Sequence, residues 1–161
     1  MELTLQDKVA IVTGAGSGVG RASALAFARE GAKVVTSDFN DAGGKETVKL
    51  LIEAGGEAVY QRCDITDEAQ AEALVAKAVS TFGRQDCGYN SAGAPGTALL
   101  TPAIGKDPAA RSHMEKMTLL RRFGEPGEIT NAAAWLCSDQ ITCVPGVAFT
   151  VCRGLKSRQL C

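Results

Sequence analysis

Histidine, tyrosine and tryptophan are scarce in this sequence of 161 residues, which contains one His, two Tyr and one Trp. The six cysteines include no Cys-x-x-Cys pair, and His113 alone is available to complete a metal site with them. We therefore expect reduced thiols, no metal site and no disulfide framework. The formal net charge of -1 provides no broad positive field, which argues against nucleic acid or an anionic membrane surface as the main partner.

Long apolar runs are absent as well. A membrane span needs roughly 18 consecutive apolar residues, and no such run occurs. The first residues show no basic segment followed by an apolar one. We expect a cytoplasmic protein without a membrane partner. The composition, 45% hydrophobic and 22% charged, provides enough apolar matter for one core, which predicts a single domain over residues 1–161.

Short β-branched runs alternate with longer helical patterns along the first half of the chain. Strands are expected at 8–13, 33–38 and 57–62, and a weaker one at 85–89, which Gln85 and Gly88 interrupt. Helices are expected at 19–30, 41–54 and 67–82, at 113–120, and at 125–137 with Pro126 in its first turn. A last strand is expected at 147–151. This order predicts an α/β fold, a three-layer Rossmann-like parallel sheet with about five strands.

A glycine-rich turn joins the first expected strand to the first helix. It reads Thr13-Gly14-Ala15-Gly16-Ser17-Gly18-Val19-Gly20. Residues without a Cβ let the backbone approach a ligand, and the free N–H groups of a helix N-terminus favour an anion. The strand-to-helix context therefore predicts a site for a dinucleotide diphosphate. A tight turn without a ligand is the alternative.

Asp38 closes the second expected strand. An acid about 20 residues beyond the last loop glycine is where such a unit hydrogen-bonds the adenosine ribose. The carboxylate would repel a 2′-phosphate, and Ala15, Gly16 and Ser17 offer no basic side chain. NAD is therefore favoured over NADP. The alternative is that Asp38 only ends a strand.

Asp64 follows the third expected strand, near the sheet edge where ligands collect in such folds. From spacing alone, a hydrogen bond to adenine and an ordinary turn-starting role are equally good interpretations.

Taken together, these features resemble the short-chain dehydrogenase/reductase family. The likeness rests on the glycine loop, Asp38, Cys63-Asp64-Ile65-Thr66, Tyr89-Asn90-Ser91-Ala92-Gly93, and Arg122-Phe123-Gly124-Glu125-Pro126-Gly127. It implies NAD(P)(H)-dependent oxidation of alcohols or reduction of carbonyls, with adenine bound by Asp64 and Asn90 beside the adenosine. The cofactor-binding residues it implies are Gly14, Gly16, Ser17, Gly18, Val19, Gly20, Asp38, Phe39, Cys63, Asp64, Ile65, Asn90, Ala92 and Gly93.

The sequence departs from the family at its catalytic centre. Family members carry seven strands and a Tyr-x-x-x-Lys, whereas the residues four places after Tyr60 and Tyr89 are Asp64 and Gly93. We therefore assign no catalytic residue. The domain is expected to divide into a cofactor-binding half at 5–93, a junction at 94–112, and C-terminal helices with a last strand at 113–155. Whether Pro95-Gly96 belongs to the later part of the family pattern or to the preceding loop is left open.

These departures predict an NAD(H)-binding protein of oxidoreductase type that is weakly active or silent, because lost acid/base help typically slows a reaction about 10²- to 10⁴-fold. One alternative is an active oxidoreductase whose proton donor is His113 or a partner chain's residue. Others are a non-catalytic interaction protein or truncated product, and a methyl-donor site. Because the last strand would lack its family partner, either the strand at 147–151 lies beside the fourth strand or the fourth strand pairs with another molecule. We expect a homo-oligomer or marginal solubility.

Overall fold

The computed structural model describes residues 4–91 and 126–139, together with positions 108, 109, 112, 116 and 122. Within them, one parallel sheet has the strand order β3-β2-β1-β4. The strands are β1 (Val9–Thr13), β2 (Lys33–Asp38), β3 (Ala58–Arg62) and β4 (Cys87–Asn90). The helices are α1 (Gly18–Arg29), α2 (Asp41–Glu53), α3 (Glu68–Phe82) and α6 (Pro126–Cys137).

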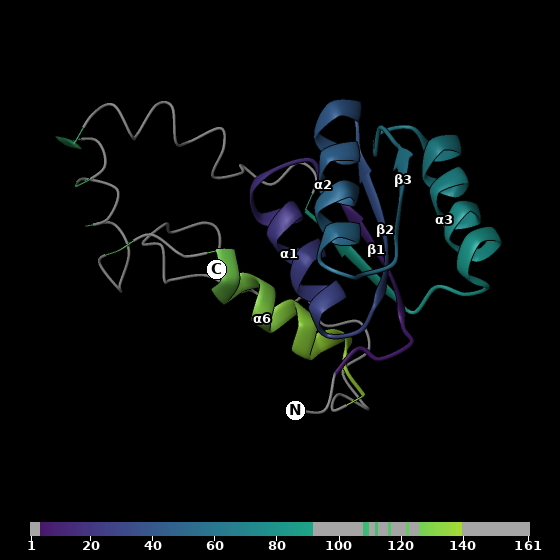
Figure 1. The fold of residues 1–161 in the computed structure, drawn as a ribbon. Helices are drawn as coiled ribbons and strands as arrows, with labels where there is room; N and C mark the ends of the chain where they lie inside the picture. Colours follow the sequence, from purple (N-terminus) through teal and green to yellow (C-terminus); the bar gives the residue numbers. More distant parts are fainter. Residues whose placement is uncertain are drawn as a thin grey trace.

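The sheet is the middle of three layers. Helices α1, α2 and α6 cover one face and α3 covers the other, as Figure 1 shows. The predicted three-layer parallel α/β fold is confirmed. The strand expected at 147–151 lies outside the described residues, as does the helix expected at 113–120 apart from position 116.

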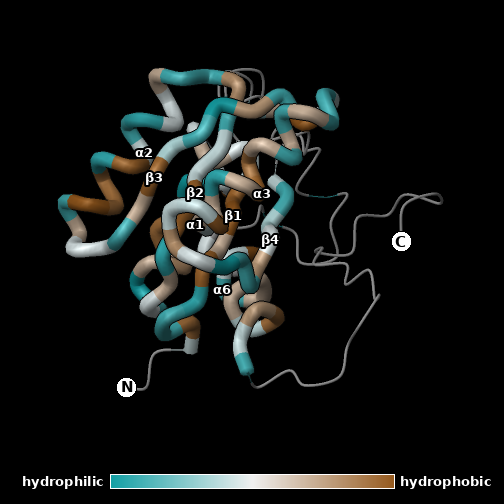
Figure 2. The backbone as a smooth tube through the Cα atoms, turned by 90° about the vertical axis from the view of Figure 1, so that its right-hand side faces the viewer, coloured by the Kyte–Doolittle hydropathy of each residue, from teal (hydrophilic) through white to brown (hydrophobic). Residues whose placement is uncertain are grey.

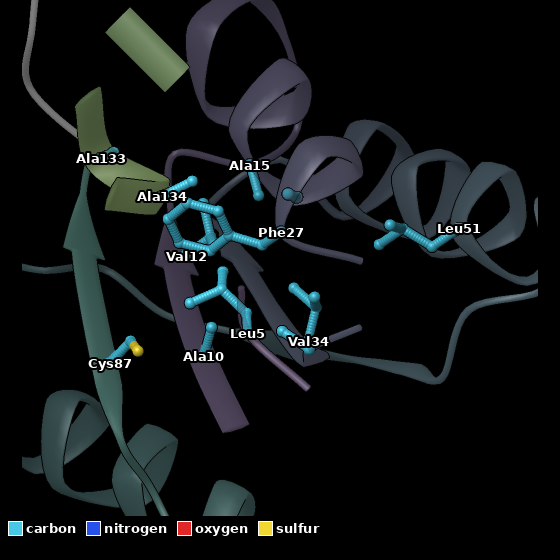
Figure 3. Close-up of a cluster of buried hydrophobic side chains, with 12 residues drawn as sticks. Leu5, Ala10, Val12, Ala15, Phe27, Val34, Leu51, Cys87, Ala133 and Ala134 are labelled. Carbon is cyan, nitrogen blue, oxygen red and sulfur yellow. The ribbon is translucent and has the colours of Figure 1, made fainter. Parts of the chain in front are cut away.

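All five residues of β1 are buried, as expected of a strand that is covered on both faces of the sheet. Successive side chains of a strand point to opposite faces, so Ala10 and Val12 join one core and Val9 and Ile11 the other. The first core holds Phe27 of α1 and Leu51 of α2 (Figure 3), and the second holds Leu74 of α3. In Figure 2 the middle of the sheet at β1 is accordingly brown, whereas α2 alternates between teal and brown.

Helix ends follow the turn residues in the sequence. Gly31, Gly55 and Gly83 follow α1, α2 and α3 with φ of 91°, 85° and 81°, a left-handed conformation that favours glycine. Asp67 caps α3 by accepting hydrogen bonds from the N–H groups of Ala69 and Gln70, at 3.0 and 3.4 Å. These signals placed the predicted helices within one or two residues of those observed.

Helix α6 comes from the far end of the described chain and packs beside α1 (Figure 1). Ala133 and Ala134 are buried in the same core as Phe27. The hydroxyls of Ser23 in α1 and Thr130 in α6 also form a buried hydrogen bond of 3.3 Å between the two helices. The segment around α6 therefore completes the core that supports α1. None of the helices in the described part of the chain combines the length and apolar character that crossing a membrane requires.

Candidate functional site

The turn between β1 and α1 is built so that only glycine fits at key positions. Gly14 and Gly18 have φ of 65° and 54°. A Cβ on Gly20 would lie 2.1 Å from the carbonyl oxygen of Gly14, a contact with backbone that cannot yield easily. The absence of side chains therefore lets the first turn of α1 pack directly on the loop and leaves the loop's outer side accessible to a ligand.

The N-terminus of α1 differs from those of α2 and α3. Asn40 caps α2 by accepting from the Gly43 N–H at 3.3 Å, and Asp67 caps α3; both helices also have an acid in the first turn. Ser17, at the N-cap of α1, makes no side-chain capping bond, and no acid lies in that first turn. The positive end of this helix dipole is thus not neutralised from within, as a site for a bound anion requires.

Asp38 ties the end of β2 to this loop. Its Oδ2 accepts a hydrogen bond of 2.8 Å from the N–H of Gly16, and its Oδ1 accepts one of 2.9 Å from the N–H of Asn40. The side chain is partly exposed. An ionised carboxylate has about four acceptor positions, so it retains capacity for the hydroxyls of a sugar. A Cβ on Gly16 would approach Oδ2 to 2.7 Å, which explains the glycine there.

Arg21 was not among the predicted site residues, yet its guanidinium group fixes the position of the loop through hydrogen bonds. Its Nη2 donates to the carbonyl oxygens of Gly16 and Gly43 at 2.5 and 3.3 Å, and its Nε donates to Thr47 Oγ1 at 2.9 Å. Thr47 in turn donates to the carbonyl of Ala15 at 2.7 Å. This network holds α1, the loop and the first turns of α2 together.

A sequence signal for this contact exists in the adjacent glycines Gly43 and Gly44, which are unusual inside a helical pattern. A Cβ on Gly43 would lie 2.7 Å from the Gly16 carbonyl oxygen. One on Gly44 would lie 2.0 Å from the ring of Tyr60. Both glycines therefore permit α2 to approach closely, Gly43 toward the loop and Gly44 toward β3.

Neither tyrosine is placed as an acid or base at the loop. The Tyr60 hydroxyl lies 2.8 Å from the carbonyl oxygen of Asp38, to which it donates, and 2.9 Å from Asp41 Oδ1. Burial, followed by the contact with Asp41, raises its pKa far above the ordinary value, so the hydroxyl keeps its proton. Tyr89 packs edge-on against Phe27, with 5.9 Å between ring centres.

The residues after β3 are divided between core and surface. Asp64 Oδ1 accepts from the N–H and hydroxyl of Thr66 at 3.0 and 2.7 Å, and these hydrogen bonds lower the pKa of the Asp64 carboxyl. The turn role is thus present, and the adenine contact stays a prediction. Cys63 is 2% exposed in the α3-side core, so only its main chain is available to a ligand. Ile65 and, beyond β2, Phe39 are exposed, at 47% and 72%.

Asn90 stands at the end of β4, where its Oδ1 accepts a hydrogen bond of 3.2 Å from the Thr13 hydroxyl. This bond joins the carboxyl ends of β1 and β4, beside the start of the loop. The predicted site residues Ala92 and Gly93, and the candidate donor His113, lie outside the described residues. Among the residues that are described, no cluster of side chains is suited to hold a metal ion.

The chain is similar in sequence, as well as in fold, to known dehydrogenases. The family model described as short chain dehydrogenase matches residues 8–115, and the model described as Enoyl-(Acyl carrier protein) reductase matches residues 95–156. The chain is 36% identical over 133 residues to a 2,5-dichloro-2,5-cyclohexadiene-1,4-diol dehydrogenase of Sphingobium indicum, across 83% of this chain and 46% of that protein. It is 44% identical over 94 residues to the 7alpha-hydroxysteroid dehydrogenase of Escherichia coli, across 58% of this chain and 37% of that protein.

The chain therefore spans less than half the length of these two curated relatives. Among solved structures, a 7 alpha-hydroxysteroid dehydrogenase complexed with NADH and 7-oxo glycochenodeoxycholic acid superposes with a TM-score of 0.73 at 25% identity. That superposition covers 85% of this chain and 89% of that chain.

Proposed function

The chain belongs to the short chain dehydrogenase family, and on that premise we propose that its glycine loop and Asp38 bind the adenosine diphosphate part of NAD(H). The observation that carries the proposal is the uncapped N-terminus of α1, with a carboxylate fixed beside it by the Gly16 N–H. A diphosphate would complete the hydrogen bonds of the helix amides, and Asp38 would accept from the ribose hydroxyls. The solved relative that contains NADH supports this ligand.

We favour NAD over NADP because of the charges around Asp38. A 2′-phosphate would face this carboxylate, and the loop residues 15–17 carry no basic side chain. The two nearby guanidinium groups have other partners: Arg21 donates to backbone carbonyls, and Arg62 lies 3.8 Å from Asp41. A phosphate at this position would therefore meet repulsion from Asp38, which neither of these two guanidinium groups is placed to offset.

The base would lie beyond Asp38, between the ends of β2 and β3. Phe39 and Ile65 present apolar surface there, and burying such surface against a planar base is favourable. We assign Asp64 and the main chain of Cys63 to the same part of the ligand. Asn90, with Ala92 and Gly93 after it, is assigned to the side of the adenosine nearest β4.

The family is one of oxidoreductases, and a bound nicotinamide supplies the hydride donor or acceptor of their reactions. The chain's own contribution to the proton transfer is where we expect a deficit. No tyrosine in the 161 residues is followed four positions later by lysine. The Tyr60 hydroxyl already donates a hydrogen bond to the Asp38 carbonyl oxygen and lies beside the Asp41 carboxylate. We therefore propose cofactor binding with weak or no turnover; a donor from a partner chain is the alternative that would restore activity.

Titration of the full chain with NADH, followed by nicotinamide fluorescence, tests the proposal. Asp38→Ala is expected to weaken NADH binding at least about tenfold, as for the loss of hydrogen bonds to a charged group. It should also reduce the preference for NADH over NADPH. Glu46→Ala, which removes the same charge from an exposed position on α2, should leave both affinities unchanged. Asp38→Asn, which retains one acceptor oxygen, serves if the alanine variant does not fold.

NADH affinity that is equal in wild type, Asp38→Asn and Asp38→Ala would refute the assignment of Asp38. An intact, folded chain with no measurable affinity for NAD or NADH would refute the proposed function itself.

A further inference from the structure

Two cysteines distant in sequence lie close together, one at the start of β4 and the other at the end of α6. Cys87 begins β4, and Cys137 ends α6. The Cys87 thiol lies 3.8 Å from the carbonyl oxygen of Cys137. Both side chains belong to the same apolar core, in which Cys87 is 5% exposed and Cys137 is partly buried. Figure 3 shows Cys87 on the face of the sheet that carries Ala133 and Ala134 of α6.

The two thiols are in an unequal electrostatic setting. The neighbouring Cys87 side chain lowers the pKa of Cys137, although burial opposes this. The neighbouring Cys137 side chain, burial and the nearby Asp86 raise the pKa of Cys87. Lys8, which pairs with Asp139 beyond the end of α6, favours the thiolate at both sulfurs. Cys137 is consequently the better nucleophile of the pair, and Cys87 the protonated partner.

We propose that Cys87 and Cys137 form an oxidisable dithiol, a modification site that a low-molecular-weight disulfide such as glutathione disulfide converts into an intramolecular disulfide. The inference is independent of nucleotide binding. It rests on the contact between the Cys87 thiol and the main chain of Cys137, and on the different exposure of the two side chains. A reactive cysteine has to be reachable, whereas its resolving partner does not.

The exchange takes two steps. The Cys137 thiolate attacks one sulfur of glutathione disulfide, which forms a bond between Cys137 and one glutathione and releases the other as a thiolate. The Cys87 thiol then gives up its proton and attacks the Cys137 sulfur, which forms the intramolecular bond and releases the second glutathione thiolate. The two cysteines lose two electrons and two protons, and glutathione disulfide becomes two reduced glutathiones.

The disulfide would fasten the last turn of α6 to the sheet. In the reduced state this contact depends on the small side chains of Ala133 and Ala134 and on the Ser23 to Thr130 hydrogen bond. Cross-linking residues 50 positions apart restricts the unfolded chain and should raise Tm by several degrees. Dithiothreitol should reverse the rise.

The test uses the full chain with Cys143, Cys152 and Cys161 replaced by serine, treated with glutathione disulfide near neutral pH. Intact mass should fall by two hydrogen atoms, and peptide mapping should identify one cross-link, between Cys87 and Cys137. Cys63→Ala in this background should still form it. Cys87→Val should stop at a mixed disulfide of glutathione with Cys137, because the resolving thiol is gone.

Three results would overturn the proposal. One is a protein of unchanged circular dichroism that forms no intramolecular disulfide. Another is a glutathione adduct on Cys137 that persists although Cys87 is present. The last is a cross-link that uses Cys63 in place of either residue.

Discussion

The conformation of the loop between β1 and α1 requires glycine at position 20. Any side chain there would meet the Gly14 carbonyl at 2.1 Å. We expect Gly20→Ala to destabilise the protein by about 1–3 kcal/mol, as overpacking does, and to reduce NADH binding, because α1 must move away from the loop. Urea unfolding measures the first effect and NADH fluorescence the second.

Gly127 in α6 provides the matched control, since a Cβ there meets nothing within 4 Å. Gly127→Ala should be neutral or stabilise by up to about 1 kcal/mol, because alanine is the better helix former. Equal loss of stability in both variants would show that the contact between Gly20 and Gly14 is not what limits the site.

Arg21 is expected to set the position of the loop without touching the ligand. Arg21→Met keeps the apolar stem and removes the donors to Gly16, Gly43 and Thr47. NADH binding should weaken by roughly tenfold or more, whereas adenosine, which lacks the diphosphate, should lose little. Arg21→Lys should restore part of the NADH affinity. Arg29→Met, an exposed change in the last turn of the same helix, should have no effect. A parallel loss of adenosine binding would indicate general loosening instead of loop positioning.

At the scale of elements, the sequence was most informative where local rules and burial agree. The residues of β2 were predicted without error because a β-branched run ends there at an acid. The observed β4 is Cys87–Asn90, shifted from the expected 85–89, since Gly88 leaves little apolar pattern to fix its limits. The helix caps and stops were likewise readable, because each depends on a few neighbouring residues.

Contacts between elements were not predictable in the same way. The Arg21 network depends on how closely α2 approaches the loop, which only the packed structure defines. The pairing of Cys87 with Cys137 depends on α6 returning to the sheet from beyond the junction. The sequence pattern indicated reduced thiols, but it contained no information on which residues these two cysteines would contact.

Asp86, just before β4, links that element to the start of β1. Its Oδ2 accepts from the Val9 N–H at 2.9 Å, and its Oδ1 accepts from Arg84. Partial burial acts to raise the pKa of Asp86, but the hydrogen bonds from Arg84 and Val9 outweigh it and the pKa is lowered. Stability from this group is therefore present above the unfolded value of about 3.9 and is lost as pH falls through the lower folded value.

We accordingly expect Asp86→Asn to be less stable than wild type at neutral pH, with the difference shrinking below about pH 4. Urea midpoints at several pH values measure this difference. Asp67→Asn, at an N-cap where asparagine is also a good cap, serves as a control that should remain close to wild type near neutral pH. A difference between wild type and Asp86→Asn that stays constant down to about pH 3 would contradict the role given to Asp86.

At the scale of the whole molecule, the feature that bears on association is the edge of the sheet at β4. Among the described residues β4 has a strand neighbour on one side only, β1, and α3 covers the other three strands. Gly88 of β4 is exposed on the α3 side, where a Cβ would meet only Gln85, at 3.7 Å. Within the described part of the chain this is an open edge beside an uncovered face, an arrangement that favours pairing with a second strand. We therefore expect a homo-oligomer that uses this edge.

Gly88→Lys tests this expectation, because a charged side chain on an edge strand opposes edge-to-edge pairing and space for it exists here. Sedimentation velocity should show wild type as an oligomer and Gly88→Lys shifted toward the monomer, with unchanged circular dichroism. Gly127→Lys adds the same charge at an open position on α6 and should leave the oligomer intact. A wild-type chain that stays monomeric at high concentration would contradict association. An oligomer that both lysine variants preserve would place the contact elsewhere than β4, because the added charge would then lie outside the interface.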